Sequence, residues 1–443
     1  MSKQQESLQE EKSLLEQEQE AQKEKEEFIE KCKIVPPTIE ITYINIGGTR
    51  DSRYGFDISH RVGVTGTDLG EPSIYRTIDR LQHVGSPIKL NVVTKMKKDS
   101  NDINEKDIDE ICKEIQKDKT GKIIINGGLD RAIYIMKKIE KRLKGIKKTI
   151  VYGGSNGSFY SNRKAVFVDH GLELGAVQVY PYGFYLATNL AVFQLKNVKR
   201  NIFIAPENTM VNRSIFSRKD TIADESGKLL NIPEFVVEDF GGTFGKMLEN
   251  SAYHKEQEYV YPVIGTIETL FNEILKKFGV SILLKGSVVI GKRIDSMLSD
   301  QKYREKALSI IKAVSSTNHL ISHGTDSMVN MMKEVYQKGE RNRNYIFLGS
   351  CTPLSEEETT DGYHSVGSAF AILSYLEGIA SGEIAVRPSS NVWLSMGGFV
   401  MSYNEDIIKD NEGRFIRTSK EVHDNYVLLN DKHLCLYKQN LKK

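Results

Sequence analysis

Cysteine is scarce in this sequence. The chain has four cysteines, and no two of them form a CxxC pair: Cys32, Cys112, Cys351 and Cys435. Their spacing therefore indicates neither a zinc site nor a thiol redox motif. A few scattered cysteines in a chain of 443 residues are typical of proteins that fold in a reducing compartment.

Long apolar runs are missing as well. No stretch reaches the roughly 18 apolar residues that a membrane-spanning helix requires. The first residues are polar and charged, without the apolar core of a signal peptide. We therefore expect a soluble, cytoplasmic protein without a membrane partner.

An excess of charge of one sign is also absent. The 61 Lys and Arg residues nearly balance the 59 Asp and Glu residues, so the formal net charge is +2. This balance gives no reason to expect a nucleic-acid partner. Residues 137–148 (KKIEKRLKGIKK) are locally basic, but the spacing of Ile139, Leu143 and Ile146 favours the solvated face of a helix.

The composition is that of a globular protein, with 39% hydrophobic and 27% charged residues, and the length suggests two or three domains. Residues 1–37 form a charged N-terminal arm that ends at Pro36-Pro37. Its apolar positions make a poor heptad, so we expect a helical or disordered solvated arm rather than a strong coiled coil.

After this arm the sequence alternates between two patterns. Short runs rich in β-forming residues are separated by helical stretches, and examples are 38–46, 122–127, 148–154 and 200–206. Such alternation predicts α/β units in which helices wind around mainly parallel sheets.

An internal repeat runs through this part of the chain. Residues 44–52 align with 238–246, so that Thr49 matches Thr243, 194 positions later. Further alignments join 124–138 with the segment from Leu320 and 149–155 with 345–351, both at an offset of 196, and 201–220 with 391–410 at 190. The constant order predicts two homologous units at 38–225 and 232–415, with a linker near 224–234 and a C-terminal extension at 416–443.

Each unit opens with a Gly-Gly-Thr turn after its first strand, ending at Thr49 and Thr243. Glycine pairs let the backbone turn sharply and approach a ligand, and ligands of doubly wound sheets bind beyond the carboxyl ends of the strands. The threonine hydroxyl would then point into a site. Alternatively, the threonine caps the next helix, and the motif alone does not distinguish the two.

A second turn of interest is His323-Gly324-Thr325-Asp326, which connects a predicted strand to a predicted helix. The carboxylate is favoured there by the helix N-terminus, which makes a simple capping pair one interpretation. The other is a proton relay with a lysine. A threonine hydroxyl needs an adjacent base to act as a nucleophile, and burial lowers the pKa of a lysine enough to provide one.

Four segments together resemble the amino-terminal domain of the bacterial-type asparaginase/glutaminase family: 241–253 (GGTFGKMLENSAY), 322–328 (SHGTDSM), 345–362 (YIFLGSCTP to TTDG) and 392–410 (VWLSMGGFVMSYNEDIIKD). That family opens with a GGT turn, followed by a lid tyrosine, a DSxD segment, the HGTD turn, a strand leading to DG, and a lysine beyond the next strand. The resemblance covers most of 38–415, once per unit, and implies two tandem asparaginase-like, doubly wound units.

Carried over by position, the resemblance makes Thr243 the nucleophile, activated by Tyr253 of the lid. Thr325, Asp326 and Lys409 become the second threonine and its relay. The implied substrate-binding positions are Gly242, Asp295, Ser296 and Gly324. The implied reaction is hydrolysis of the side-chain amide of asparagine or a related small molecule. It proceeds through an acyl-enzyme and releases ammonia, with no metal or cofactor.

The chain departs from the family pattern in both units. The first unit keeps matches at Thr49, Ser100, Asp130 and Lys219, but it has Leu129 for the second threonine and Gly127 for the histidine. We therefore expect it to lack the chemistry and to act as a packing partner, with a separate ligand site as the alternative.

In the second unit the later acid of DSxD is replaced by Leu298. The resemblance also implies that the repeated unit stands where the family has a second domain, which completes a neighbour's site. Two interpretations stay open. One is an amidohydrolase, either a homo-oligomer or an intramolecular pseudo-dimer of the two units. The other is an inactive asparaginase-like pseudoenzyme that serves in scaffolding or assembly.

Overall fold

The computed structural model describes the backbone of residues 38–51, 69–83, 86–155, 159, 163–188, 190–204, 213–218, 236–239, 301–313, 316–322, 328–350, 361–385, 388, 390–403, 407–409, 415–417, 426–428 and 435–437. The predicted arm at 1–37 and the predicted linker at 224–234 lie outside these residues. All of the described residues belong to one compact unit, which spans Thr38–Lys443.

The first sheet has six strands in the order β2-β1-β3-β4-β5-β6. The first five are parallel, and β6 returns antiparallel to β5. The strands are β1 (Ile39–Asn45), β2 (Ile88–Thr94), β3 (Lys122–Asn126), β4 (Thr149–Gly153), β5 (Gly183–Thr188) and β6 (Ala191–Gln194). Central strands such as β3, which reads KIIIN, are nearly continuous apolar runs because both faces of the sheet are covered.

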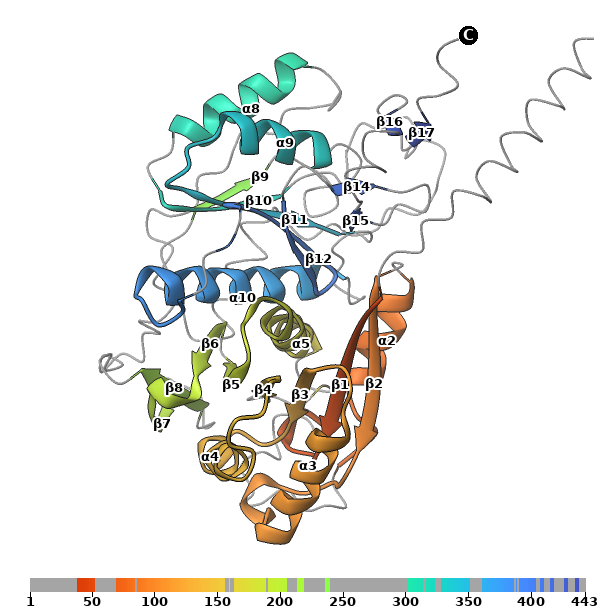
Figure 1. Ribbon diagram of the computed structural model, residues 1–443, viewed down its shortest axis with the longest axis vertical. Helices are drawn as coiled ribbons and strands as arrows, with labels where there is room; N and C mark the ends of the chain where they lie inside the picture. The colour runs from red at the N-terminus through yellow and green to blue at the C-terminus, as the bar shows by residue number, and fades with distance from the viewer. Residues whose placement is uncertain are drawn as a thin grey trace, which may run out of the picture. The chain divides into compact units, whose positions relative to one another are not determined.

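Helices cover this sheet on both faces (Figure 1). One face packs Ile123 and Ile125 with α3 and α4, and the other packs Ile124 and Val151 with α2 and α5. The helices are α2 (Ile74–His83), α3 (Glu105–Lys117), α4 (Ala132–Arg142) and α5 (Arg163–Val179). The predicted helix in the basic run 137–148 is therefore α4, although it ends at Arg142, before the last six residues of the run.

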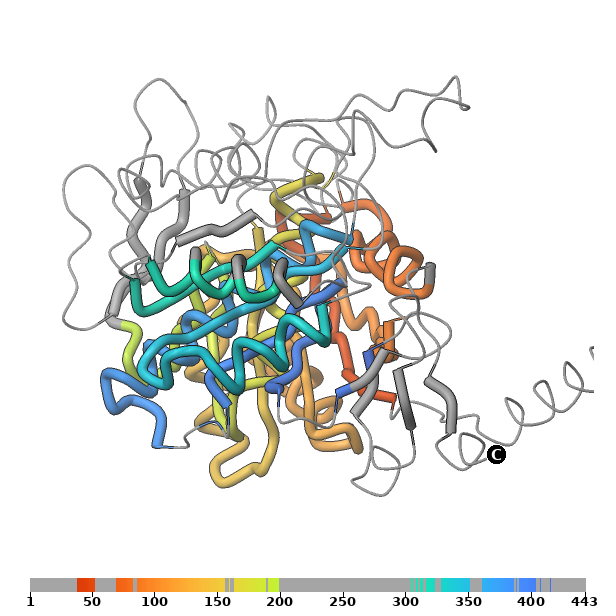
Figure 2. The backbone as a smooth tube through the Cα atoms, turned by 90° about the horizontal axis from the view of Figure 1, so that it is seen from above, coloured from red at the N-terminus to blue at the C-terminus, as the bar shows by residue number. Residues whose placement is uncertain are grey.

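Within the described residues, the second sheet has five strands in the order β13-β12-β11-β10-β9, and of these only β13 is antiparallel to its neighbour. The strands are β9 (Val236–Asp239), β10 (Asn318–Ser322), β11 (Asn344–Gly349), β12 (Val392–Met396) and β13 (Phe399–Ser402). Its helices are α8 (Gln301–Ala313), α9 (Met328–Lys338) and α10 (Gly362–Ala380). Figure 2 shows α8 and α9 side by side. The predicted α/β class with mainly parallel sheets is confirmed.

Three short antiparallel pairs in the described part of the chain lie outside the two main sheets. They are β7 (Val198–Ile204) with β8 (Arg213–Arg218), β14 (Ile407–Lys409) with β15 (Phe415–Arg417), and β16 (Tyr426–Leu428) with β17 (Cys435–Tyr437). None of the helices in the described part of the chain combines the length and apolarity that crossing a bilayer requires.

One of the four repeat alignments is wrong. The alignment of 201–220 with 391–410 equates β7 with β12, but β12 pairs parallel with β11 in the main sheet, whereas β7 pairs antiparallel with β8. By sheet position, β12 and β13 correspond to β5 and β6. Both hairpins carry a residue of positive φ at the same point, Leu190 (φ 64°) and Gly398 (φ 81°), which are 208 positions apart. The apolar runs look alike, so their pattern could not identify which strand pairs with which. The match between Lys219 and Lys409 loses its support.

Helices α5 and α10 pack against each other along their length. Both are buried over most of their length, including every residue from Ala165 to Val177 and from Gly362 to Leu376. Glycines make the approach possible, since a Cβ on Gly171 would collide with the backbone of His364, and a Cβ on Gly367 with the backbone of Val168.

Candidate active site

The described part of the chain contains one of the predicted site residues. Lys409 is the last residue of β14, where its backbone pairs with Phe415 of β15. The other predicted residues lie outside the described residues: Gly242, Thr243, Tyr253, Asp295, Ser296, Gly324, Thr325 and Asp326. Their predicted roles stay predictions.

The strands that lead into these motifs are neighbours. β9 ends at Asp239, just before Gly241, and β10 ends at Ser322, immediately before His323. The two strands are parallel, and Asp239 and Ser322 are partners in the register. The GGT and HGTD segments therefore start from adjacent strands at one edge of the second sheet. Strand β14, which carries Lys409, contacts α9, the helix that begins two residues after Asp326.

The turns that align with GGT and HGTD in the predicted first unit lie within the described residues. Gly47 and Gly48 follow β1 with φ of +104° and +101°, values that favour glycine. A Cβ on Gly48 would stand 2.5 Å from the backbone nitrogen of Gly128, and one on Gly47 would stand 2.6 Å from the carbonyl oxygen of Lys98. The turn after β1 therefore lies backbone to backbone against the turn after β3.

The segment that matches DSxD joins the same edge. Ser100 opens the 3-10 helix η4 (Ser100–Asp102) and is 2% exposed. A Cβ on Gly128 would stand 2.7 Å from Ser100 Oγ, and among the described residues that hydroxyl has no hydrogen-bond partner. Asp99 caps η4 by accepting a bond of 2.8 Å from the backbone N–H of Asn101. Burial raises the pKa of Asp99.

Leu129 stands where the second threonine is expected. It is buried and packs against Gly154, where a Cβ would be 2.7 Å from its Cδ2 atom. The Tyr152 hydroxyl donates a bond of 2.8 Å to the carbonyl of Gly128 and so holds this turn. Asp130, the next residue, is exposed. The turn after β3 therefore has a buried leucine at the position where a proton relay would need a hydroxyl.

A buried ion pair lies directly behind the GGT turn. Thr49 opens the 3-10 helix η1 (Thr49–Asp51), and the next residue, Arg50, donates two hydrogen bonds to Glu173 of α5. Arg50 Nη1 is 3.0 Å from Glu173 Oε2, and both side chains are at most 1% exposed. Burial raises the pKa of Glu173, and the charge of Arg50 opposes this rise.

Asp169 lies one helical turn before Glu173 on α5. Burial raises its pKa to about 7, although the charge of Arg50 acts in the opposite direction. Sequence reasoning missed this group of charges. The available signal was the pair of Asp169 and Glu173, four positions apart in a mostly apolar stretch of the helix, because such spacing places both carboxyls on one face.

Asp51 fixes the other side of η1. It accepts hydrogen bonds from the backbone N–H of Ser73 (2.8 Å), from the Ser73 hydroxyl (2.9 Å) and from the Asn126 side-chain amide (3.0 Å). Burial raises the pKa of Asp51, and the bonds from Ser73 lower it. The residues after the GGT turn are therefore tied to the start of α2 and to the end of β3.

A threonine and two histidines join three helices. Thr77 Oγ1 of α2 lies 2.7 Å from His170 Nδ1 of α5 and 3.0 Å from His364 Nε2 of α10. All three side chains are fully buried. Burial lowers the pKa of both histidines, to about 3 for His364. The imidazoles are therefore neutral near pH 7, and the hydroxyl can donate to one and accept from the other.

No protein-family model matches this sequence, and no curated protein matches it. Two similar solved structures are the thermostable L-asparaginase from Thermococcus kodakarensis and a probable cytoplasmic L-asparaginase from Campylobacter jejuni. Each has a TM-score of 0.31 and 11% identity over 76% of this chain, covering 86% and 99% of the other chain respectively. Likeness at this level says nothing about the reaction.

Proposed function

We propose that the chain is an asparaginase-like amidohydrolase that hydrolyses a small side-chain amide at the second sheet. Thr243 forms the acyl-enzyme, with Tyr253 activating it. Thr325, Asp326 and Lys409 form the relay. Gly242, Asp295, Ser296 and Gly324 hold the substrate. No metal or cofactor takes part, and the site of action is the cytoplasm.

The observation that carries this proposal is the parallel register of Asp239 with Ser322. Two threonines can act on one amide only if their turns leave the sheet at the same place. This register aligns the ends of the two neighbouring strands from which the turns begin. The first sheet supports the same arrangement, because there the matching turns at Gly48 and Gly128 are in contact. Ligands of parallel α/β sheets bind at this edge.

We further propose that 38–225 and 232–415 are tandem copies that pack as an intramolecular pseudo-dimer. The strands β1, β3, β4, β5 and β6 lie in the same order, and run in the same relative directions, as β9 to β13. The helix contacts are reciprocal, since Gly171 meets His364 while Gly367 meets Val168, and these residues correspond at an offset of 196. Reciprocal contacts are the signature of a two-fold interface.

The decisive experiment measures ammonia release from asparagine and glutamine by the purified full chain. Thr243→Ala and Thr325→Ala should each abolish turnover, because each removes a hydroxyl that touches the reacting amide. Thr49→Ala is the matched control, since it removes the corresponding threonine of the first unit. Its activity should equal that of wild type. Turnover that survives in both second-unit variants would refute the proposal.

A second candidate is an inactive asparaginase-like pseudoenzyme with a scaffolding role. The observation that favours it is Leu129, which fills the wall of the first-unit turn where the relay needs a hydroxyl. A wild-type chain that releases no ammonia above Thr243→Ala, while remaining folded by circular dichroism, would select this candidate over the enzyme.

A further inference from the structure

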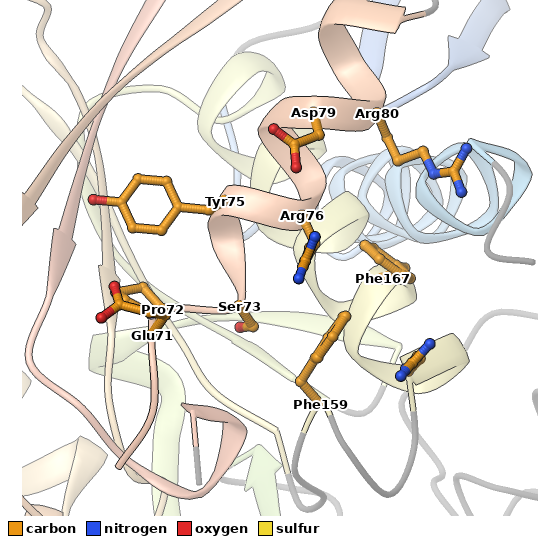
Figure 3. Close-up of a pocket in the computed structure, with 10 residues that line it drawn as sticks. Glu71, Pro72, Ser73, Tyr75, Arg76, Asp79, Arg80, Phe159 and Phe167 are labelled. Carbon is orange, nitrogen blue, oxygen red and sulfur yellow. The ribbon is translucent and has the colours of Figure 1, made fainter. Parts of the chain in front are cut away.

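A cavity of about 770 Å³ opens between α2 and the start of α5 (Figure 3). Its volume lies within the range of small-molecule and cofactor sites. Its described lining residues lie at 71–80 and 159–167, outside the segments to which the amidohydrolase chemistry is assigned. The described lining includes three positively charged and three aromatic side chains: Arg76, Arg80, Arg163, Tyr75, Phe159 and Phe167.

The arginines come from two helices and approach one space. Arg76 and Arg80 are four positions apart on α2, so they share a face of that helix. Arg163 is the first residue of α5, where the helix end itself favours an anion. Among the described residues, neither Arg76 nor Arg163 makes an ion pair, so their guanidinium groups are available to a ligand.

The aromatic rings lie beside these charges. Figure 3 shows Arg76 extending from α2 toward Phe159. The ring centroids of Phe159 and Phe167 are 5.6 Å apart in an edge-to-face arrangement, and Arg163 Cζ is 5.5 Å from the centroid of Phe159. Phe159 is half-buried, whereas Phe167 belongs to the core. A planar ring entering the cavity would therefore meet an aromatic surface held in place from behind.

Two carboxylates also line the cavity, and they limit the charge that it accepts. Glu71 lies 3.8 Å from Lys97, which neutralises part of its effect, and Asp79 is exposed. With three arginines and two carboxylates, the lining carries only a small excess of positive charge. Such a lining suits an anion of low charge better than a triphosphate. The acids can also accept hydrogen bonds from ligand hydroxyls.

The walls are held by the contacts that fix α2. Ser73, which lines the cavity, donates its backbone N–H and its hydroxyl to Asp51, and the backbone N–H of Phe159 donates to the carbonyl of Arg50 at 2.9 Å. Further along α2, Thr77 is held by His170 and His364. A preformed cavity costs a ligand little ordering free energy.

We propose that this cavity binds a nucleoside mono- or diphosphate. The arginines grip the phosphate, for which the guanidinium fork is suited. Phe159 provides the surface on which the base stacks. A bare phosphate would leave most of the volume and the half-buried Phe159 ring unused. The proposal is independent of the amidohydrolase chemistry, and neither depends on the outcome of the other's test.

Isothermal titration of the full chain with AMP, ADP, GMP and UMP, beside inorganic phosphate and adenosine, tests it. At least one nucleotide should bind about tenfold more tightly than either phosphate or adenosine, because only the nucleotide uses both halves of the cavity. Binding of no nucleotide, or of phosphate as tightly as of every nucleotide, would overturn the proposal.

Three substitutions and one matched control locate the site. Arg76→Gln and Arg163→Gln should each weaken the best nucleotide about tenfold, the loss expected for one charge-assisted contact. Phe159→Leu should remove the advantage of the nucleotide over phosphate. Arg341→Gln, at an exposed turn after α9, should change nothing. Equal affinity in wild type and both glutamine variants, or the same loss in the control, would exclude this cavity.

Discussion

Gly48 and Gly128 lie so close that a single added carbon on Gly48 would stand 2.5 Å from the backbone nitrogen of Gly128. Two strand-end turns, 80 positions apart in the sequence, therefore meet through bare backbone. The contact sets the spacing between the GGT turn and the turn that follows β3. It also explains why position 48 carries glycine, whereas a Cβ on Gly128 would instead meet the Ser100 Oγ atom at 2.7 Å.

Replacing Gly48 with alanine tests this contact. The new side chain would meet both a clash and an unfavourable φ of +101°, so we expect a loss of roughly 2–5 kcal/mol in the free energy of unfolding. Gly121→Ala is the matched control, since Gly121 also has a positive φ (+70°) but faces open space, and it should cost only roughly 1–2 kcal/mol. Urea denaturation measures both. Equal losses would show that the close approach contributes nothing.

The buried pair of Arg50 and Glu173 gives a second prediction. Arg50→Met removes the cation and leaves the Glu173 carboxyl buried without its partner, which typically costs about 3–5 kcal/mol. The double variant with Glu173→Leu should recover part of this loss, because both buried charges are then gone. A double-mutant cycle by urea denaturation gives the coupling. Strictly additive losses would mean that the two side chains do not stabilise each other.

A surface pair provides the contrast. Lys113 and Glu110 are 2.6 Å apart on α3, but both side chains are more than half exposed. Lys113→Met should leave the free energy of unfolding without a measurable change, because water and salt screen such pairs. A loss as large as that of Arg50→Met would show that burial is not what distinguishes the two ion pairs.

The sheets were predictable because local sequence specifies them. A run such as KIIIN at 122–126 is apolar on both faces, so it predicts a central parallel strand without knowledge of its neighbours. The motif turns were predictable for a similar reason, since glycine pairs punctuate strand ends. The wrong alignment of 201–220 with 391–410 shows the limit of this approach. Apolar runs of similar length look alike, and only pairing partners distinguish them.

Contacts between distant residues were not predictable from the pattern. Arg50 meets a partner 123 positions away, and Thr77 meets one 287 positions away. In the sequence, Arg50 follows a turn and resembles an ordinary exposed charge. Whether a charge is buried depends on which helix covers it, and a single sequence carries no direct record of that. Most of the predicted site stays a prediction, because Thr243 and Thr325 lie outside the described residues.

Asp169 predicts a stability that falls with rising pH. Burial raises its pKa to about 7, against the charge of Arg50, from about 3.9 in an unfolded chain. Between these values the folded protein holds a proton that the unfolded chain has released, so the free energy of unfolding falls by up to about 1.4 kcal/mol per pH unit. The difference between wild type and Asp169→Asn, from urea denaturation between pH 4 and pH 7, isolates this effect. A difference that is independent of pH would contradict it.

His364 predicts the opposite slope. Burial lowers its pKa to about 3, from about 6.5 in an unfolded chain. Between these values the unfolded chain binds a proton that the folded protein does not, so the free energy of unfolding rises with pH. The difference between wild type and His364→Gln should therefore increase from about pH 4 to about pH 6.5 and then level off. A slope of the same sign as that of Asp169 would refute the assignment of a neutral buried imidazole.

Thr77 provides a hydrogen-bond partner to each of two neutral histidines that are buried where α2, α5 and α10 meet. Thr77→Val keeps the shape but deprives His170 Nδ1 and His364 Nε2 of their hydrogen bonds, and each buried, unpaired nitrogen costs about 1–3 kcal/mol. Thr77→Ser keeps the hydroxyl and loses one methyl group, which costs about 1 kcal/mol. Urea denaturation should therefore rank the valine variant below the serine variant. The reverse order would mean that packing of the methyl group, rather than the hydroxyl bridge, holds the three helices together.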